Sequence, residues 1–436
     1  MGRRASAANT AGGRVGRIRL GTSKLFGFGL SMLVMTVASL AAVPGMIAAD
    51  GKAAWGAIAL GQTIGTAGGV VTGYGWGLFG PAEVAGAAAT ERRVGYLESI
   101  LARMALLLPV GLVAASLAFV LAPGRPVFAA VGAVSATSTG LTAAWYFVGL
   151  TRPYAMLVLE TIPRAGGTAA GIALMGLGHS AVTLPGCTCV GMIAGFAMST
   201  AWVFRSTARE GAERVRPRSL RVVLSSHWHG VATHFAMATC AAAPLMIVST
   251  VAPAVQPAFA LADKVQTQTN VGLGPARAVL QGWVPRATGS ARARRARTAL
   301  LVSAGFAIAV GAGMVALAPG LMRWLGNGQI SLSWAVVFLV AACCALTFFV
   351  RSFELVALAP FERLDVAARA IIANSIVGLP TVALGAVFLG TIGALGGVLV
   401  GLLMCVLIEY AEYARSIRPL SRDVARSLGG RLRGVS

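Results

Sequence analysis

Residues 370–408 read AIIANSIVGLPTVALGAVFLGTIGALGGVLVGLLMCVLI and contain no charged side chain. One crossing of a lipid bilayer needs about 20 apolar residues, so this stretch is long enough for two crossings. It predicts two membrane-spanning helices, at 366–389 and 393–414, joined by a short turn. A soluble core would not require an apolar run of this length.

The composition of the whole chain extends this pattern. Of the 436 residues, 57% are hydrophobic and only 11% are charged, whereas soluble domains contain about 45–50% apolar and 25% charged residues. Further apolar runs, bounded by charge, Pro or Gly, predict spans at 25–48, 55–80, 100–122, 127–149, 154–177, 184–204, 226–251, 254–284, 299–318 and 331–350. The expected fold is an all-α polytopic membrane protein of about 12 transmembrane helices, without a large extramembrane catalytic domain.

The basic residues predict the orientation of these spans. The formal net charge is +22, but Lys and Arg lie in short clusters between apolar runs and not on one surface, which argues against nucleic-acid binding. With both termini in the cytoplasm, 30 of the 36 basic residues lie in cytoplasmic segments, and only Lys52, Arg125 and Arg323 lie in outside loops. This asymmetry predicts a multi-pass protein of the cytoplasmic membrane with both termini inside the cell.

A long basic cluster divides the spans into two sets of six, as expected of a transporter built from two related halves. The predicted organisation is a basic cytoplasmic N-terminus at 1–24, an N-terminal six-helix bundle at 25–204, a basic cytoplasmic linker at 205–225, a C-terminal six-helix bundle at 226–414 and a basic cytoplasmic tail at 415–436.

Small residues in the spans predict close helix packing. Glycines recur every four residues in the second and last spans, at Gly61, Gly65, Gly69, Gly73, Gly77, Gly393, Gly397 and Gly401. Such a stripe favours tight packing against a second helix; the alternative is a groove or a helix that bends during transport. The six cysteines lie in apolar segments without the spacing of a zinc site, and the histidines near 227–234 lack a third ligand, so we expect no metal.

Three basic side chains lie deep within the predicted spans, while Arg103 and Arg369, near the cytoplasmic ends of theirs, are counted with the cytoplasmic segments. A charge at the centre of a bilayer costs about 2.5–3.5 kcal/mol on insertion scales, so Arg164, Lys264 and Arg277 need partners or a water-filled cavity. Glu160 lies four residues before Arg164, on the same face of a regular helix. Either these two neutralise each other, or Arg164 faces a cavity.

The span at 254–284 contains a polar run that a lipid-facing helix would not tolerate: Asp263, Lys264, Gln266, Thr267, Gln268, Thr269 and Asn270. Neighbouring side chains on a helix point about 100° apart, which disfavours a simple ion pair between Asp263 and Lys264. The run predicts contact with water or a polar ligand, or else a structural polar core. Lys264 and Arg277, joined by Arg164 of the other half, would form a cationic chamber suited to phosphate.

Three stretches resemble one family of transporters. Trp145, Tyr146, Phe147 and Gly149 close the fourth span, with Arg164 downstream; Ala262, Asp263 and Lys264 precede Pro285; and 72–80 is a Gly-aromatic motif. Together they are similar to polysaccharide flippases of the Wzx or O-antigen transporter type, in the superfamily that also holds drug/cation antiporters and lipid II flippases. Gly73 stands where relatives commonly carry an acid, so the resemblance assigns no proton or cation role to this helix.

The resemblance implies two six-helix bundles around a central cavity that opens alternately inward and outward. The cargo would be an isoprenoid-diphosphate-linked oligosaccharide for surface polysaccharide synthesis, bound by Arg164, Lys264, Arg277, Gln268 and Asn270. Asp263 and Glu160 are the candidates for ion coupling. Membrane lipids, a polysaccharide polymerase and glycosyltransferases are the expected partners.

No cofactor is expected, and other functions remain as alternatives. Ala53 follows the only Gly-Lys pair, Gly51–Lys52, so the chain contains no phosphate-binding loop for a nucleotide. A lipid II-type flippase or a drug/cation antiporter would use the same architecture. A membrane glycosyltransferase or acyltransferase would need catalytic acids or a histidine in sizeable outside loops, whereas the predicted outside loops are short and Asp50 is their only acid. A non-enzymatic transporter is therefore favoured.

Overall fold

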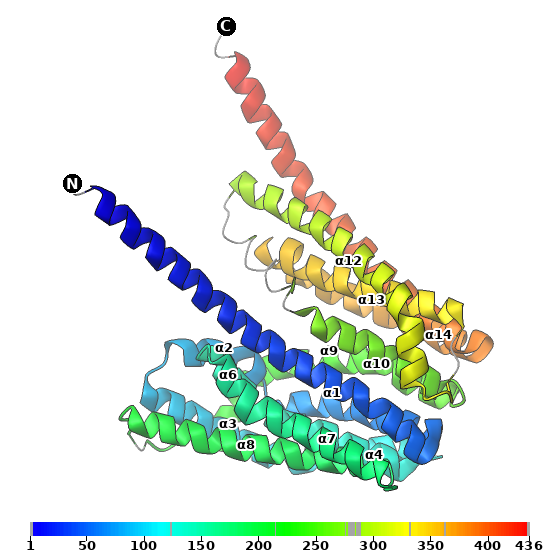
Figure 1. Ribbon diagram of the computed structural model, residues 1–436. Coiled ribbons are helices and arrows are strands. Elements are labelled where there is room, and N and C mark those ends of the chain that lie inside the picture. Colours follow the sequence, from blue (N-terminus) through cyan, green and yellow to red (C-terminus); the bar gives the residue numbers. More distant parts are fainter. Residues whose placement is uncertain are drawn as a thin grey trace. The chain divides into compact units, whose positions relative to one another are not determined.

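The chain folds into two compact units, unit 1 (1–242) and unit 2 (243–436). The computed structural model describes residues 3–122, 124–213, 215–274, 276–277, 284, 289–330, 333–361 and 363–433. All regular elements within these ranges are helical (Figure 1). The predicted all-α fold class is confirmed.

Unit 1 is a bundle in which a long first helix packs against several others. Its elements are α1 (Arg3–Gly73), α2 (Trp76–Gly86), α3 (Ala89–Leu121), α4 (Pro126–Thr137), the 3₁₀ turn η1 (Ser138–Leu141), α5 (Ala144–Gly149), α6 (Pro153–Met156), the π-helical turn η2 (Leu157–Thr161), α7 (Ile162–Gly176) and α8 (Thr183–Arg209). α1 contacts α3, α4 and α7, and α7 runs beside α8 (Figure 1). The helix α9 (Leu220–Val251) begins in unit 1 and ends in unit 2.

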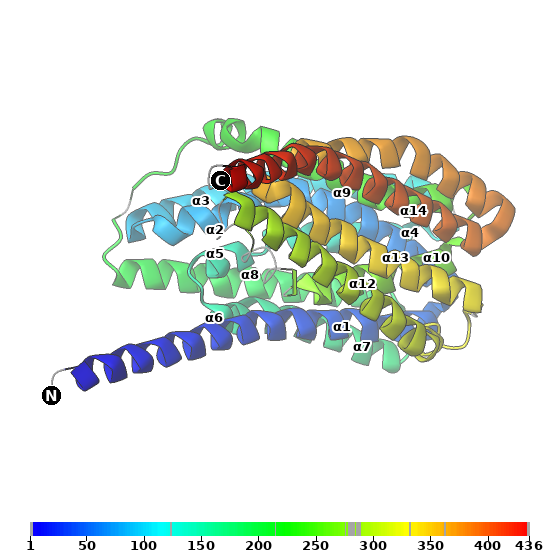
Figure 2. The ribbon, with the colours of Figure 1, turned by 90° about the horizontal axis from the view of Figure 1, so that it is seen from above.

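Unit 2 is built around α13. Its remaining elements are α10 (Gln256–Gly272), α12 (Gly289–Leu325), α13 (Trp334–Phe353), the π-helical turn η3 (Glu354–Leu358), the 3₁₀ turn η4 (Ala359–Phe361) and α14 (Leu364–Arg433). α13 contacts α10, α12 and α14, and Figure 2 shows α12 and α13 running side by side. In the predicted eighth span α10 ends at Gly272, and residues 275 and 278–283 of that prediction lie outside the described residues.

The helices correspond to the predicted spans. Within the described residues, eight helices are long and apolar enough to cross a membrane. Two of them, Phe26–Gly86 and Asp365–Arg415, each cover two predicted spans. The predicted spans at 154–177 and 254–284 are not among the eight. All twelve predicted spans therefore contain helix.

Glycines divide the two long helices. Gly51 in α1 has φ 83° and Gly390 in α14 has φ 61°, a region of backbone conformation that side chains disfavour. Each kink lies between a pair of predicted spans. The helix consequently folds back on itself, and after Gly390 the glycine stripe of the last span packs against the preceding span, where Gly393 meets the backbone of Gly385.

The glycine stripe of the second span packs against α4. A Cβ atom added to Gly61 or Gly65 would overlap the backbone of Ala129 or Ala133. At Gly77, by contrast, no heavy atom lies within 4 Å of an added Cβ. The close-packing interpretation is confirmed for the first part of the stripe, where the missing side chains let two helices touch along their backbones.

Candidate functional site

The helix of the fourth span is interrupted, and two buried charged side chains form hydrogen bonds with the backbone groups that lack partners there. After α4 the chain passes through η1 and two non-helical residues before α5 begins at Ala144. Arg103 of α3 donates hydrogen bonds to the carbonyls of Leu141 (3.3 Å) and Thr142 (2.9 Å). Glu160 accepts bonds from Ala143 N–H (3.1 Å) and Thr142 Oγ1 (2.8 Å). A helix break inside a membrane needs such partners, because no water is available there.

The Glu160 side chain links several elements of unit 1. Its side chain is 2% exposed, and its carboxylate also accepts a hydrogen bond from Ser199 Oγ of α8 at 2.8 Å. One carboxylate thus ties together the broken fourth span, η2 and α8. This position differs from that of an ion-coupling acid open to a cavity, and the candidate coupling role of Glu160 remains a prediction.

The i,i+4 pair that the sequence offers between Glu160 and Arg164 does not form. No ion pair joins the two within the described part of the chain. The cause is that η2 is a π-helical turn, so residues four positions apart no longer lie on the same face of the helix. The cause is local: Pro163 lacks an N–H, and its ring would clash with the carbonyl of Leu159 in a regular helix. In unit 2, η3 likewise ends two residues before Pro360.

Arg103 was missed by sequence reasoning, which assigned it to a cytoplasmic segment. The structure buries it in α3 with 1% exposure. Its guanidinium carbon lies 5.5 Å from the centroid of the Trp145 ring, a cation–π arrangement. The available signal was its position within the apolar run 100–122, since a basic residue inside such a run needs buried acceptors.

Arg164 is half-buried in α7, and its Nε is enclosed without a hydrogen-bond acceptor among the described residues. The guanidinium therefore retains donor capacity in unit 1. Arg164 and Glu160 are the two predicted site residues in unit 1, and the others lie on or after α10 in unit 2.

In the polar run of α10, Gln266 has a partner on α13, whereas the charges of Asp263 and Lys264 have none among the described residues. Gln266 Nε2 donates to Thr347 Oγ1 of α13 at 2.9 Å, which fixes α10 to the centre of unit 2. Asp263 and Lys264 are half-buried. Neither forms a hydrogen bond or ion pair with the described residues, as their helical spacing predicts for the pair. Gln268 is also half-buried.

The structure brings Arg277 and Asn270 together. Arg277 lies after the end of α10, and its guanidinium donates to the carbonyl of Asn270 at 2.7 Å. A cation at this position is favoured, since the last carbonyls of a helix lack intrahelical partners. The Asn270 Oδ1 is buried without a donor among the described residues, so this end of α10 keeps an unused acceptor.

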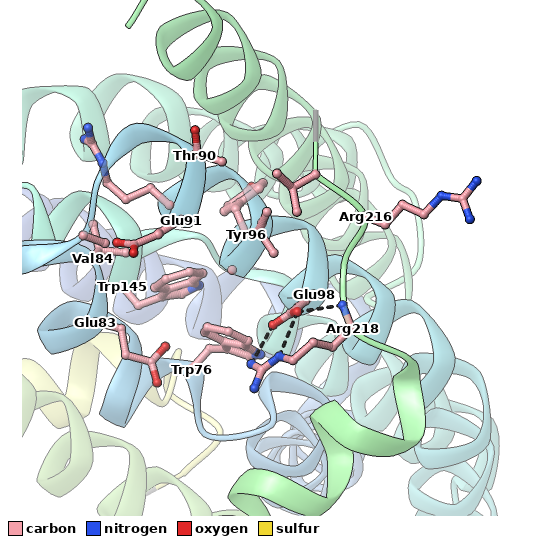
Figure 3. A pocket seen from close by; sticks show the side chains of 15 residues that line it. Trp76, Glu83, Val84, Thr90, Glu91, Tyr96, Glu98, Trp145, Arg216 and Arg218 are labelled. Atoms are coloured by element: carbon pink, nitrogen blue, oxygen red, sulfur yellow. Dashed lines mark hydrogen bonds and ion pairs between the residues drawn. The ribbon is translucent and has the colours of Figure 1, made fainter. Parts of the chain in front are cut away.

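The predicted cytoplasmic linker is fastened to unit 1 over part of its length. Arg218 donates to Glu98 through its backbone N–H (2.8 Å), Nε (2.9 Å) and a terminal nitrogen (2.7 Å), as Figure 3 shows. The side-chain hydrogen bonds to the Glu98 carboxylate raise the pKa of Arg218. A second ion pair joins Arg92 of α3 to Glu210. The segment after α8 therefore follows the surface of unit 1.

The histidines and cysteines of the described residues form neither a metal-binding group nor a disulfide bond. No group of three or more His, Cys, Asp or Glu side chains there could hold a metal ion, and the six cysteines are free thiols. His227 lies 3.4 Å from Glu83 and contacts the rings of Trp76 and Phe79, so it fastens the start of α9 to α2.

These features define a polytopic helical membrane protein in which two buried charges, Arg103 and Glu160, form hydrogen bonds with the break in the fourth span. A scan of protein-family models gives no match, and neither does a search of curated proteins. Among solved structures, an inward-facing conformation of a multidrug resistance MATE family transporter of the MOP superfamily is similar, with 14% sequence identity and a TM-score of 0.62 over 92% of this chain and 98% of that chain.

Two further structures extend the comparison. An outward-facing conformation of a multidrug resistance MATE family transporter is 14% identical, with a TM-score of 0.55 over 91% of this chain and 95% of that chain. A eukaryotic MATE transporter is 14% identical, with a TM-score of 0.51 over 92% and 98%. The chain is thus similar in fold to MATE transporters over more than nine-tenths of each chain.

Proposed function

We propose that this chain is a membrane transporter that moves its substrate by alternating access. The observation that carries the proposal is the similarity of the fold over almost the full length of both chains to MATE transporters in inward-facing and outward-facing conformations. The broken fourth span and the two π-helical turns add support, because discontinuous helices surround the binding sites of many transporters. The cytoplasmic membrane is the proposed location.

One candidate substrate is an isoprenoid-diphosphate-linked oligosaccharide. In the described residues, none of Arg164, Lys264 and Arg277 forms an ion pair with a carboxylate, which leaves three cations inside or beside the spans able to bind a diphosphate or an acidic sugar. Gln268 and Asn270 on α10 would contribute hydrogen bonds to the same ligand. The glycosyltransferases and the polymerase of a surface polysaccharide would then be the functional partners.

The second candidate is a drug/cation antiporter. The MATE structures of the comparison include multidrug resistance transporters, so the fold neighbours favour this candidate over the glycan flippase. Of the two acids that the sequence offers for ion coupling, Asp263 is the one available to a cation, because Glu160 is held by three hydrogen bonds. The adjacent Lys264 opposes such binding, since a cationic site repels a cationic ligand.

The decisive experiment is to delete the gene and to locate the lipid-linked glycan. Extracted lipids are analysed for diphosphate-linked oligosaccharide, and an impermeant glycan-binding probe reports how much of it reaches the outer leaflet. Accumulation inside the cell, reversed by the intact gene, supports the flippase. Normal display of glycan together with new sensitivity to cationic drugs supports the antiporter, and normal behaviour in both assays contradicts the transport proposal.

Substitutions then test the cationic residues. We expect Arg164→Ala, Lys264→Ala and Arg277→Ala each to abolish outward display without lowering the amount of protein in the membrane. Arg209→Ala is the matched control, because Arg209 is exposed at the end of α8. Outward display retained in all three variants would contradict the assignment of these cations to the substrate.

A further inference from the structure

A cavity of about 310 Å³ lies in unit 2, where α12 ends, the chain turns and α13 begins. Its volume is at the lower end of the range of about 300–1,000 Å³ that is usual for ligand sites. The charge asymmetry of the sequence predicts this end of the unit to lie outside the cytoplasm, because Arg323 belongs to a predicted outside loop. The described residues that line the cavity include none of those assigned above to substrate transport.

The wall of this cavity is mainly apolar. The uncharged side chains that line it are those of Pro319, Met322, Ile330, Trp334 and Val337. Met322, Ile330 and Val337 are buried in unit 2, so this part of the wall is held in place by the surrounding packing. It offers dispersion contacts to a hydrocarbon chain and requires no hydrogen bond from it.

Arg323, in the last turn of α12, is the only charged side chain among the described residues that line the cavity. It is exposed, and it forms no hydrogen bond or ion pair with the described residues. The end of α12 does not require it. The carbonyl of Met322 accepts a hydrogen bond from the N–H of Gly326 at 2.8 Å, and that of Trp324 accepts one from Asn327 at 3.2 Å. The guanidinium donors therefore remain available to a ligand.

Exposed aromatic rings surround the cavity. Trp324, Trp334 and Phe338 are each more than half exposed, and the ring centroids of Trp334 and Phe338 are 6.3 Å apart. Tryptophan side chains gather where the hydrocarbon of a bilayer meets its headgroups, because the indole ring is apolar and its N–H is polar. The cavity is therefore expected at the depth of the headgroups, with the lipids of the outer leaflet as its neighbours.

The charge at the cavity favours an anionic headgroup. A guanidinium can donate two parallel hydrogen bonds to one phosphate. The described lining residues include no carboxylate, so the ammonium group of a zwitterionic lipid would have no ionic partner there, and an organic cation would be repelled by Arg323. A free phosphate ion would leave the apolar wall unused.

We propose that this cavity binds one anionic phospholipid of the outer leaflet, with the phosphate on Arg323 and the first part of one acyl chain against Met322, Ile330 and Val337. This lipid is a bound partner of unit 2 and not cargo. The proposal goes beyond the proposed function and holds for either candidate substrate, because none of the transport residues takes part in the site.

The test uses the full-length protein in nanodiscs of phosphatidylcholine. A small fraction of the lipid is phosphatidylglycerol with a photoreactive diazirine near the carboxyl end of one acyl chain, and a phosphatidylcholine with the same diazirine is the reference probe. Mass spectrometry of the digested protein then locates the labelled residues. Arg323→Gln removes the charge. Arg125→Gln is the matched control, because Arg125 is an exposed arginine of another predicted outside loop and lies over the ring of Phe128.

We expect the phosphatidylglycerol probe to label residues 319–337 several-fold more than the reference probe. Arg323→Gln should lower this labelling about tenfold, as expected from the loss of a hydrogen bond to a charged group, and Arg125→Gln should leave it unchanged. Equal labelling by the two probes, or an unchanged signal in Arg323→Gln, would overturn the proposal. An equal loss in both variants would do the same, since it would reduce the effect to general surface charge.

A competitor identifies the source of the phosphate. Unlabelled phosphatidylglycerol should displace the probe at lower concentration than undecaprenyl diphosphate, a lipid with an isoprenoid chain. The reverse order would assign the cavity to an isoprenoid lipid and overturn the phospholipid as its occupant. Labelling requires no transport, so failure of the transport proposal in the deletion strain would leave this result standing.

Discussion

Replacement of Glu160 by Ala should destabilise unit 1 strongly. The substitution removes the acceptor of three hydrogen bonds, from Thr142, Ala143 and Ser199. Hydrogen bonds between membrane helices contribute about 0.6 kcal/mol on average and at most about 1.7 kcal/mol, so the three together are worth about 2–5 kcal/mol. The loss also leaves the buried Arg103 without its neighbouring negative charge.

The assay is thermal unfolding of the purified protein, followed by the fraction that stays monodisperse after heating. For a unit of 242 residues, each kcal/mol shifts Tm by about 2–4 °C, which gives an expected loss of about 5–15 °C. The Tm of Glu160→Gln should lie between those of the unmodified protein and of Glu160→Ala, because the amide retains one carbonyl oxygen that accepts hydrogen bonds. Glu213→Ala is the control, since that side chain is exposed and the hydrogen bonds of Glu213 with described residues, to Thr90 and from Val215, use its backbone.

A normal Tm in Glu160→Ala would refute the capping role derived from these hydrogen bonds. A normal Tm combined with loss of transport would return Glu160 to the ion-coupling role that the sequence suggested. Reduced stability with normal transport per folded molecule would instead confine Glu160 to holding the break in the fourth span.

Three further outcomes follow from the structure. Gly61→Ala should lower the yield and Tm of the protein, because the new methyl group overlaps the backbone of α4, while Gly77→Ala should be neutral; equal effects would contradict the packing. Arg218→Ala should speed proteinase K cleavage between 205 and 221 several-fold relative to Arg221→Ala, since it frees the linker from Glu98; an unchanged rate would show that this pair does not hold the segment. Arg103→Met should destabilise less in a Glu160→Gln background than alone, as a double-mutant cycle in Tm would reveal, whereas strictly additive effects would argue against coupling across the break.

Several site expectations failed or succeeded for identifiable reasons. The absence of an ion pair between Asp263 and Lys264 followed from the geometry of a regular helix. The pairing of Glu160 with Arg164 assumed the same regular geometry, but Pro163 and the π-helical turn η2 changed it. Arg103 was placed in a loop because basic residues near a span end are usually cytoplasmic. Its acceptors on the fourth span are visible only in the folded unit.

The sequence by itself determined the helical class and the number and approximate position of the spans. These properties are local, since the bilayer demands about 20 apolar residues per crossing and leaves the helix as the element that satisfies its own backbone. Only the tertiary structure decided the partners of the buried charges and the anchoring of the linker. Those features join residues far apart in the sequence, such as Glu160 with Ser199 and Glu98 with Arg218, and which distant segments meet depends on the packing of whole helices and not on the pattern within any one of them.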